Sequence, residues 1–167
     1  MRIRIRGENE ILTRREARYA VNWFLTDLIG PELTRGINLS LSFRPHLRGR
    51  IRKKTRDGKV KWKSAEFRGD VASYTSKQFV MRIVATESYK SQIESIAHEC
   101  KHIEQYATGK LFDYASGRHI RWKKQVIVDW EDMEYESLPW EQDAYSCDKK
   151  LANRYIAHLK EVMLEFT

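Results

Sequence analysis

The amino-acid sequence predicts an α+β fold, with helices that are separate along the chain from a small antiparallel or mixed sheet. Three observations predict it: an amphipathic helix comes first, several strands follow, and the second half returns to helical periodicity. The chain has 167 residues, the length of one domain, so a single domain over residues 1–167 is expected. Residues 1–80 form its basic half, and residues 81–167 carry its most informative polar pattern.

The N-terminal helix is predicted over residues 12–31. Thr13 and Glu16 have the spacing of a capping box, which satisfies two backbone amides at the start of a helix. Gly30 and Pro31 are typical of a helix end. The apolar stripe of this helix consists of Ala17, Ala20, Val21, Phe24, Leu25 and Leu28.

Strands are expected in the next stretch of the chain. Residues 37–43 alternate between apolar and polar side chains, as a half-buried strand does. Asp57 and Gly58 form a favourable two-residue hairpin turn, so two further strands are expected on either side of them. Residues 79–85 are apolar and predict one more strand.

Charge is unevenly distributed along the chain. Residues 1–80 carry 19 Lys and Arg against 8 Asp and Glu, a net charge of +11, whereas residues 81–167 carry a net charge of −3. The stretch 44–63 holds ten basic residues and one acid. One interpretation is an arm that binds nucleic acid through its phosphates. The other, which we prefer, is a solvated hairpin kept soluble by its charges, because only Trp62 offers a stacking ring near the run.

Composition excludes several classes of protein. The sequence has no apolar run near the ~20 residues that cross a bilayer, so no membrane partner is expected. The N-terminus is charged and lacks the apolar core of a signal peptide. Two cysteines are too few for a disulfide framework, and this composition favours a cytoplasmic location.

A second helix, predicted over residues 91–107, contains the stretch IAHECKH. His98 and His102 are one helical turn apart, so both imidazoles project from one flank and can bind the same ion. Glu99 is adjacent to that flank, where a carboxylate can reach a water bound to the metal. The pattern is typical of zinc hydrolases, in which zinc activates water and a carboxylate accepts the proton. Cys100 falls in the apolar stripe and is expected to be buried.

The sequence must supply a third ligand, and two candidates remain open. His119 follows His102 by seventeen residues. Glu141 lies in the first turn of a later helix that begins at Pro139, where the helix dipole favours an ionised carboxylate. We prefer Glu141 and keep His119 as the alternative. The core face of this later helix is expected to consist of Ala152, Ile156, Leu159, Met163 and Phe166.

The stretch HECKHIEQ resembles the HExxHxxQ helix of small zincin-type metallopeptidase-like proteins of phages and bacteria. Gln105 stands in the place of their glutamine. The stretch YESLPWEQDA is similar to their Y-x-x-x-P-W-E-x-E-A motif, with Asp143 in place of the second glutamate, and the likeness covers about residues 91–150. A weaker likeness to SprT-like proteases would use His119 instead.

The resemblance implies a minimal gluzincin-like fold, in which His98, His102 and Glu141 bind one zinc ion and Glu99 is the general base. The expected function is a zinc-dependent metallopeptidase that cleaves a protein or peptide with a zinc-bound water. If the chain is phage-encoded, it acts in the host cytoplasm. The alternative is an inactive zincin-fold binding module whose basic half docks on nucleic acid, through residues 44–63, or on an acidic partner.

Tyr135, Tyr145 and His119 are candidate donors to the oxyanion that forms during peptide hydrolysis. Asp143 and Asp148 are candidates for orienting the histidines, and the sequence does not choose between them. An exposed strand, either 71–76 or 79–85, is expected to bind the substrate as an added strand.

Overall fold

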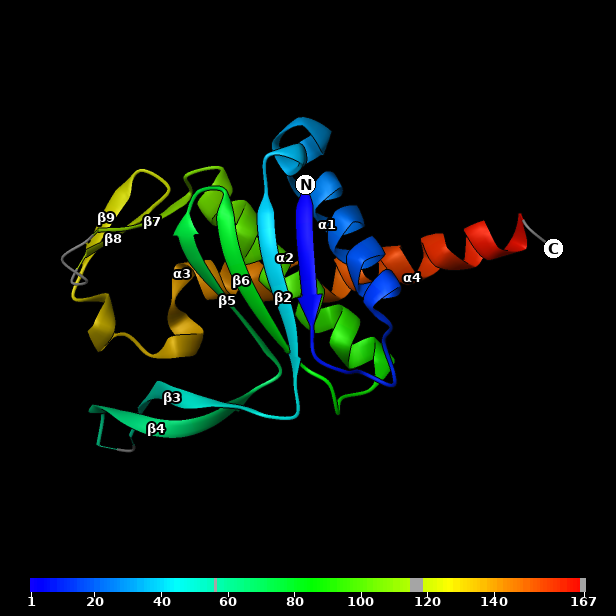
Figure 1. Ribbon diagram of the computed structural model, residues 1–167. Coiled ribbons are helices and arrows are strands. Elements are labelled where there is room, and N and C mark those ends of the chain that lie inside the picture. The colour runs from blue at the N-terminus through cyan, green and yellow to red at the C-terminus, as the bar shows by residue number, and fades with distance from the viewer. Residues whose placement is uncertain (56, 115–118, 166–167) are drawn as a thin grey trace.

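The computed structural model describes residues 1–55, 57–114 and 119–165, and it has an α+β fold (Figure 1). Its central feature is a mixed sheet with the strand order β1-β2-β6-β5. Strands β1, β2 and β6 run parallel, and β5 runs antiparallel to β6 at the edge of the sheet. These strands are β1 (Arg2–Arg6), β2 (Asn38–Arg44), β5 (Gly69–Thr75) and β6 (Gln78–Val84).

Strand β1 was not predicted, although its sequence RIRIR alternates with the period of a strand. Ile3 and Ile5 pair in register with Leu39 and Leu41 of β2 and pack against the core. The strand is short and three of its five residues are arginine, so the apolar content that identifies a strand is low. Its position beside β2 is set by the crossover through the first helix.

The first helix, α1 (Arg14–Arg35), begins as predicted, with Thr13 and Glu16 forming both hydrogen bonds of the capping box. Most of the predicted stripe is buried. The predicted end at Gly30 and Pro31 is wrong, because the helix only kinks there and a further turn follows. Gly30 adopts a φ of 77°, which breaks the hydrogen-bond ladder at low cost for a glycine, and Pro31 is then tolerated at the start of the next turn.

Helices α1, α2 (Tyr89–Ala107) and α4 (Asp148–Leu164) cover one face of the sheet, as Figure 1 shows. Helix α2 begins at its cap Ser88, slightly earlier than predicted, and it lies beside β5 and β6 and contacts both other helices. The buried core between the layers includes Phe24 of α1, Leu41 and Met81 of the sheet, and Ile96 and Cys100 of α2. The helix that carries the two histidines is therefore held on every side but one.

Strands β3 (Leu47–Lys54) and β4 (Val60–Phe67) form a separate antiparallel hairpin, as predicted from Asp57 and Gly58. The prediction of a two-residue turn is wrong. The last pair of the ladder is Lys54 and Val60, so the connection between the strands is longer than two residues. Thr55 closes this wider loop: its amide donates to the carbonyl of Lys59 at 2.7 Å and its hydroxyl donates to the same oxygen at 2.6 Å.

A small three-stranded sheet follows α2 and was not predicted. It consists of β7 (Leu111–Asp113), β8 (His119–Trp122) and β9 (Gln125–Val128), and the 3-10 turns η1 (Trp130–Asp132) and η2 (Tyr135–Ser137) come next. Strands of three or four residues are too short for their periodicity to be recognised. A second apolar cluster, which includes Leu111, Trp122 and Trp140, joins this sheet to the following helix.

The C-terminal helix was predicted as one element, but the structure divides it at Ser146 and Cys147 into α3 (Pro139–Tyr145) and α4. As a result, the buried side of α4 consists of Leu151, Ala152 and Tyr155. Of the expected core face, Ala152 is buried, Ile156 and Leu159 are half-buried, and Met163 is 71% exposed, which corrects that prediction; Phe166 lies outside the described residues. None of the helices among the described residues combines the length and apolarity needed to cross a membrane.

Candidate metal centre

A cleft opens where α2 faces the edge strand β5, the end of the hairpin and the segment around η2. Its volume is about 160 Å³. His98 and Glu99 of α2 lie at its floor, and Gly69 of β5 lies opposite them. The remaining lining residues are Glu66, Phe67, Arg68, Glu94, Ser95, Tyr135, Tyr145 and Asp148.

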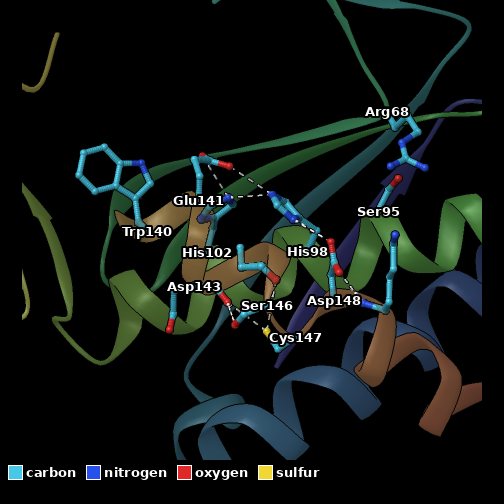
Figure 2. A network of polar contacts seen from close by, with 12 residues as sticks. Arg68, Ser95, His98, His102, Trp140, Glu141, Asp143, Ser146, Cys147 and Asp148 are labelled. Atoms are coloured by element: carbon cyan, nitrogen blue, oxygen red, sulfur yellow. Dashed lines mark hydrogen bonds and ion pairs between the residues drawn. The ribbon is translucent and has the colours of Figure 1, made fainter. Parts of the chain in front are cut away.

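The structure brings together three side chains that can bind one metal ion: His98, His102 and Glu141 (Figure 2). The two imidazole Nε2 atoms are 3.2 Å apart. Glu141 places Oε2 at 3.4 Å from Nε2 of His98 and Oε1 at 3.4 Å from Nε2 of His102. Ligands at ~2.0–2.1 Å from a tetrahedral zinc ion lie about 3.3 Å from one another. Each contact is therefore close to the spacing of two ligands on one zinc ion, and one ligand atom from each of the three residues lies within 4.8 Å of the other two.

The state of Glu141 supports the same interpretation. Its side chain is 6% exposed, so ionising it there costs free energy unless positive charge faces it. Oε2 is buried and makes no hydrogen bond among the described residues, although the imidazole of His98 lies 3.4 Å away. A cation between the carboxylate and the two imidazoles would satisfy this oxygen, so the residues present fit a bound metal.

His98 is oriented by a carboxylate from the next helix. Its Nδ1 lies 3.3 Å from Oδ2 of Asp148, in the first turn of α4. An ionised carboxylate only accepts hydrogen bonds, so Nδ1 carries the proton and Nε2 presents its lone pair to the metal position. Of the two aspartates left open by the sequence, Asp148 is the one that contacts a histidine.

His102 is oriented by Gln105 on the same helix. The Nδ1 atom of His102 lies 2.9 Å from Oε1 of Gln105. The amide of Gln105 then donates to the backbone carbonyl of Trp140 at 2.9 Å and to Oδ2 of Asp143 at 3.1 Å. The glutamine therefore links α2 to the helix that carries Glu141, and Asp143 acts on the site through Gln105. The sequence pointed to Gln105 only through the family resemblance.

These orienting contacts lead to a testable expectation. We expect Gln105→Ala and Asp148→Asn each to weaken zinc binding by about 10–100-fold, the usual effect of removing an outer partner of a ligating histidine. Competition of the purified variants against a fluorescent chelator measures the affinity. The exposed Gln142→Ala on α3 is the matched control and should bind zinc as the wild type does. Unchanged affinity in both variants would show that the contacts do not orient the ligands.

The titration properties of the three residues follow from their burial and proximity. Burial favours the neutral acid of Glu141, but the close imidazoles of His102 and His98 outweigh it and lower its pKa to about 2. Burial opposes the charged form of His98, yet hydrogen bonds with Asp148 and Glu141 raise its pKa to about 10. The carboxylate is thus ionised at neutral pH, and a metal ion has to displace a proton from His98.

Glu99 lies beside the metal position in a narrow slot. Burial raises its pKa to about 7, and the neighbouring His102 and His98 partly offset that effect. The backbone of Gly69 forms the other wall, because a Cβ at that position would lie only 3.1 Å from Oε1 of Glu99. A carboxylate with a pKa near neutrality can both accept and return a proton at physiological pH.

Tyr135 and Tyr145 line the same cleft. The ring centroid of Tyr145 is 4.6 Å from that of His98. Burial and the nearby Glu141 carboxylate raise the pKa of Tyr145 to about 12, and the same causes raise that of Tyr135 further. Both phenols therefore keep their protons and can donate hydrogen bonds into the cleft.

Two alternatives from the sequence lie elsewhere. His119 is in β8 and lines another cavity, together with Trp130 and Trp140, so it does not join the imidazole pair. Its separation from α2 is set by the unpredicted sheet β7-β8-β9. The strand predicted at 79–85 is β6, which is paired on both sides and cannot accept a peptide at its edge, whereas 71–76 overlaps the edge strand β5.

Comparison of the chain with protein-family models, with curated proteins and with solved structures found no match. The function proposed below therefore depends on the residues of this chain and their geometry.

Proposed function

We propose that this protein is a zinc-dependent metallopeptidase with a gluzincin-like site. The observation that carries the proposal is the triangle of His98, His102 and Glu141, in which one ligand atom from each residue lies within 4.8 Å of the other two. The ionisable carboxylate of Glu99 lines the same cleft as His98. Two imidazoles with one carboxylate are the ligands of several catalytic zinc sites, in which water takes the fourth position. His98, one of the three, lines the cleft.

The ligand types favour zinc over the abundant hard cations. Calcium and magnesium prefer six or more oxygen ligands, whereas this group offers two nitrogen atoms and one carboxylate. Imidazole nitrogen binds zinc well and tolerates the tetrahedral geometry. Asp148 and Gln105 fix the imidazoles in the orientation that presents Nε2 to the metal.

A bound zinc ion would supply Lewis acidity and lower the pKa of its water towards ~7. Glu99 accepts a proton from the attacking water and later gives it to the leaving amine. Tyr135 and Tyr145 donate hydrogen bonds towards the carbonyl oxygen as negative charge develops on it. The narrow slot between Gly69 and α2 holds the carboxylate of Glu99 in place, because it leaves little room for other rotamers.

The edge strand β5 offers a place for the substrate backbone. One side of β5 pairs with β6, and Gly69, the first residue of β5, lines the cleft. A peptide added to this edge would extend the sheet by backbone hydrogen bonds, and its side chains would alternate between the cleft and solvent. At Gly69 the strand comes closest to Glu99, so the scissile bond would lie near this residue.

The proposal is tested by incubating the protein with one equivalent of zinc and a library of random peptides, and by identifying products with mass spectrometry. We expect defined cleavage products that disappear after dialysis against 1,10-phenanthroline and return when zinc is added. Products that persist without metal would overturn the proposal. Tight zinc binding with no product from any peptide would support instead the inactive binding module.

We also propose that the protein works in a reducing compartment such as the cytoplasm. Cys100 and Cys147 are both free thiols, and Cys100 is fully buried in the core. Thiols persist in the cytoplasm, whereas secreted proteins usually pair them. Burial raises the pKa of both thiols, so neither is suited to bind the metal or to act as a nucleophile.

A further inference from the structure

The second feature of interest is the face of the main sheet opposite the helices. Figure 1 shows this face turned towards the viewer, with α2 and α4 passing behind the strands and α1 beside β1. Side chains alternate along each strand, so the residues between the buried ones project from this face. In β1 these are the exposed Arg2, Arg4 and Arg6, separated by Ile3 and Ile5, which pack on the core.

The register of the sheet aligns further arginines with those of β1. Arg6 pairs with Ser42 of β2, and Ser42 pairs with Arg82 of β6, so the three residues form one row across the sheet. Arg44 ends β2 on the same face and is exposed. Asp70 of β5 is next to Arg82 and accepts its Nε hydrogen bond at 2.7 Å, so Arg82 neutralises this acid.

The base of the hairpin continues this basic surface. Where the chain passes from the end of β2 into β3, a cavity of about 400 Å³ is lined by Arg44, Arg48, Arg50 and Arg82. Arg50 and Arg52 also approach the ring of Trp62, at 5.9 and 4.7 Å from its centroid, and Trp62 is half-exposed. Arg52 is only 17% exposed and is paired with Glu131 and Asp132, so it is not counted with the accessible arginines.

We define the arginine face as Arg2, Arg4, Arg6, Arg44, Arg48, Arg50 and Arg82. Its charge is balanced by few acids: among the described residues, Asp70 is paired with Arg82, and Glu66 is a solvent-exposed partner of Arg48 at 3.4 Å. An exposed ion pair of this kind contributes little to the free energy of folding, so Arg48 can readily exchange Glu66 for another anion. Between the arginines lie the small side chains of Ser40, Ser42 and Ala72, which allow close approach.

We propose that the arginine face binds nucleic acid through its phosphates, without sequence preference. Arginine presents a planar fork that forms two hydrogen bonds with a phosphate, and clustered positive charge gains free energy from released counterions. The arginines of β1 are spaced about 7 Å apart along a straight strand, which suits a linear polyanion. Trp62 offers a ring on which an unpaired base can stack.

A membrane surface is the less suitable partner. Proteins that lie on anionic lipid combine basic residues with aromatic or aliphatic side chains that insert below the headgroups. On the arginine face the central apolar residue, Val80, is half-buried between two small neighbours, Ser40 and Ala72. Apart from the half-exposed ring of Trp62, which Arg50 and Arg52 approach, the surface is dominated by charge, which favours a polyanion in solution.

This inference is independent of the metal centre, but the two surfaces are adjacent. Phe67 lines both the metal cleft and the cavity at the base of the hairpin. A nucleic acid held on the arginine face would lie next to the opening of the cleft. The arrangement would bring polypeptides that are bound to the same nucleic acid close to Glu99.

The test is fluorescence anisotropy with a labelled single-stranded DNA of about 20 nucleotides and mixed sequence. If about five phosphates are contacted, we expect binding to weaken by about 100-fold between 50 and 200 mM salt. The triple variant Arg4→Thr, Arg6→Thr and Arg44→Thr should weaken binding about tenfold or more at low salt and reduce the salt slope by about one for each lost contact.

A triple variant on α4 serves as the matched control. Lys149→Ala, Lys150→Ala and Lys160→Ala removes the same charge from exposed positions and should bind DNA almost as the wild type does. Replacing the three arginines by lysine tests folding separately, because it keeps the charge and should retain most of the affinity. Equal losses in the two charge-removing triples would overturn the proposal. So would no binding of DNA by wild-type protein at low salt, or binding only to vesicles that contain phosphatidylserine.

Discussion

Glu99→Gln is expected to remove peptide hydrolysis while zinc remains bound. The substitution keeps the shape of the side chain but deletes the carboxylate that accepts the proton, and loss of a general base typically slows a reaction by about 10²–10⁴-fold. The ligand triangle of His98, His102 and Glu141 is untouched, so the metal content should stay at one equivalent. The rate is measured on the best peptide from the library, and zinc by mass spectrometry of the dialysed protein.

The control for this variant is Glu161→Gln, the same change at an exposed position of α4. It should hydrolyse the peptide at the wild-type rate. Glu99 is buried, and the neighbouring histidines offset only part of the cost of burying its negative charge. A neutral glutamine at this position should therefore not lower the thermal midpoint of unfolding. Full activity of Glu99→Gln would show that another group is the base, and the proposed mechanism would then be wrong.

The second large effect is expected for the ligands. His98→Ala and Glu141→Ala should each lose zinc on dialysis. Their zinc affinity should fall by much more than the roughly 10–100-fold expected for Gln105→Ala and Asp148→Asn, which remove only residues that orient the histidines. Each of these side chains contributes one of the three ligand atoms, and two ligands do not hold zinc against water as three do. His119→Ala should retain the full equivalent, because His119 lies on β8 and lines a different cavity.

A second substitution separates loss of ligation from loss of structure. Glu141→Gln keeps the volume of the side chain and removes its charge, so it should fold and still bind zinc poorly. Circular dichroism verifies the fold of every variant before its metal content is compared. Zinc loss in His119→Ala, together with retention in Glu141→Ala, would contradict the assignment of the third ligand and favour the alternative drawn from the sequence.

The local parts of the fold could be predicted from the sequence because short-range rules determine them. The capping box of Thr13 and Glu16, the alternation in β2 and the stripe of α2 depend on neighbours within a few positions. The juxtaposition of His98 and His102 is local in the same sense, since residues four apart face one side of a helix. The fold class followed from the order of these elements.

The elements that the sequence did not predict depend on contacts between residues that are far apart in the chain. Strand β1 is stabilised by pairing with β2, and β7 to β9 are stabilised by one another and by packing on Trp140. The break at Ser146 and Cys147 carries neither glycine nor proline, so no residue there signals it. That break turns α4 so that Asp148 reaches His98, which is why the sequence did not distinguish Asp148 from Asp143.

The two-helix origin of the metal ligands has a consequence for the energetics of the fold. An ion held by His98, His102 and Glu141 would act as a cross-link that closes the loop formed by residues 103–140. Closing a loop of that length lowers the conformational entropy of the unfolded chain and so stabilises the folded state by about 4 kcal/mol, as a disulfide would. Strands β7, β8 and β9 lie within this loop. Removal of the metal by a chelator should therefore destabilise these three strands before it affects the helices packed on the main sheet.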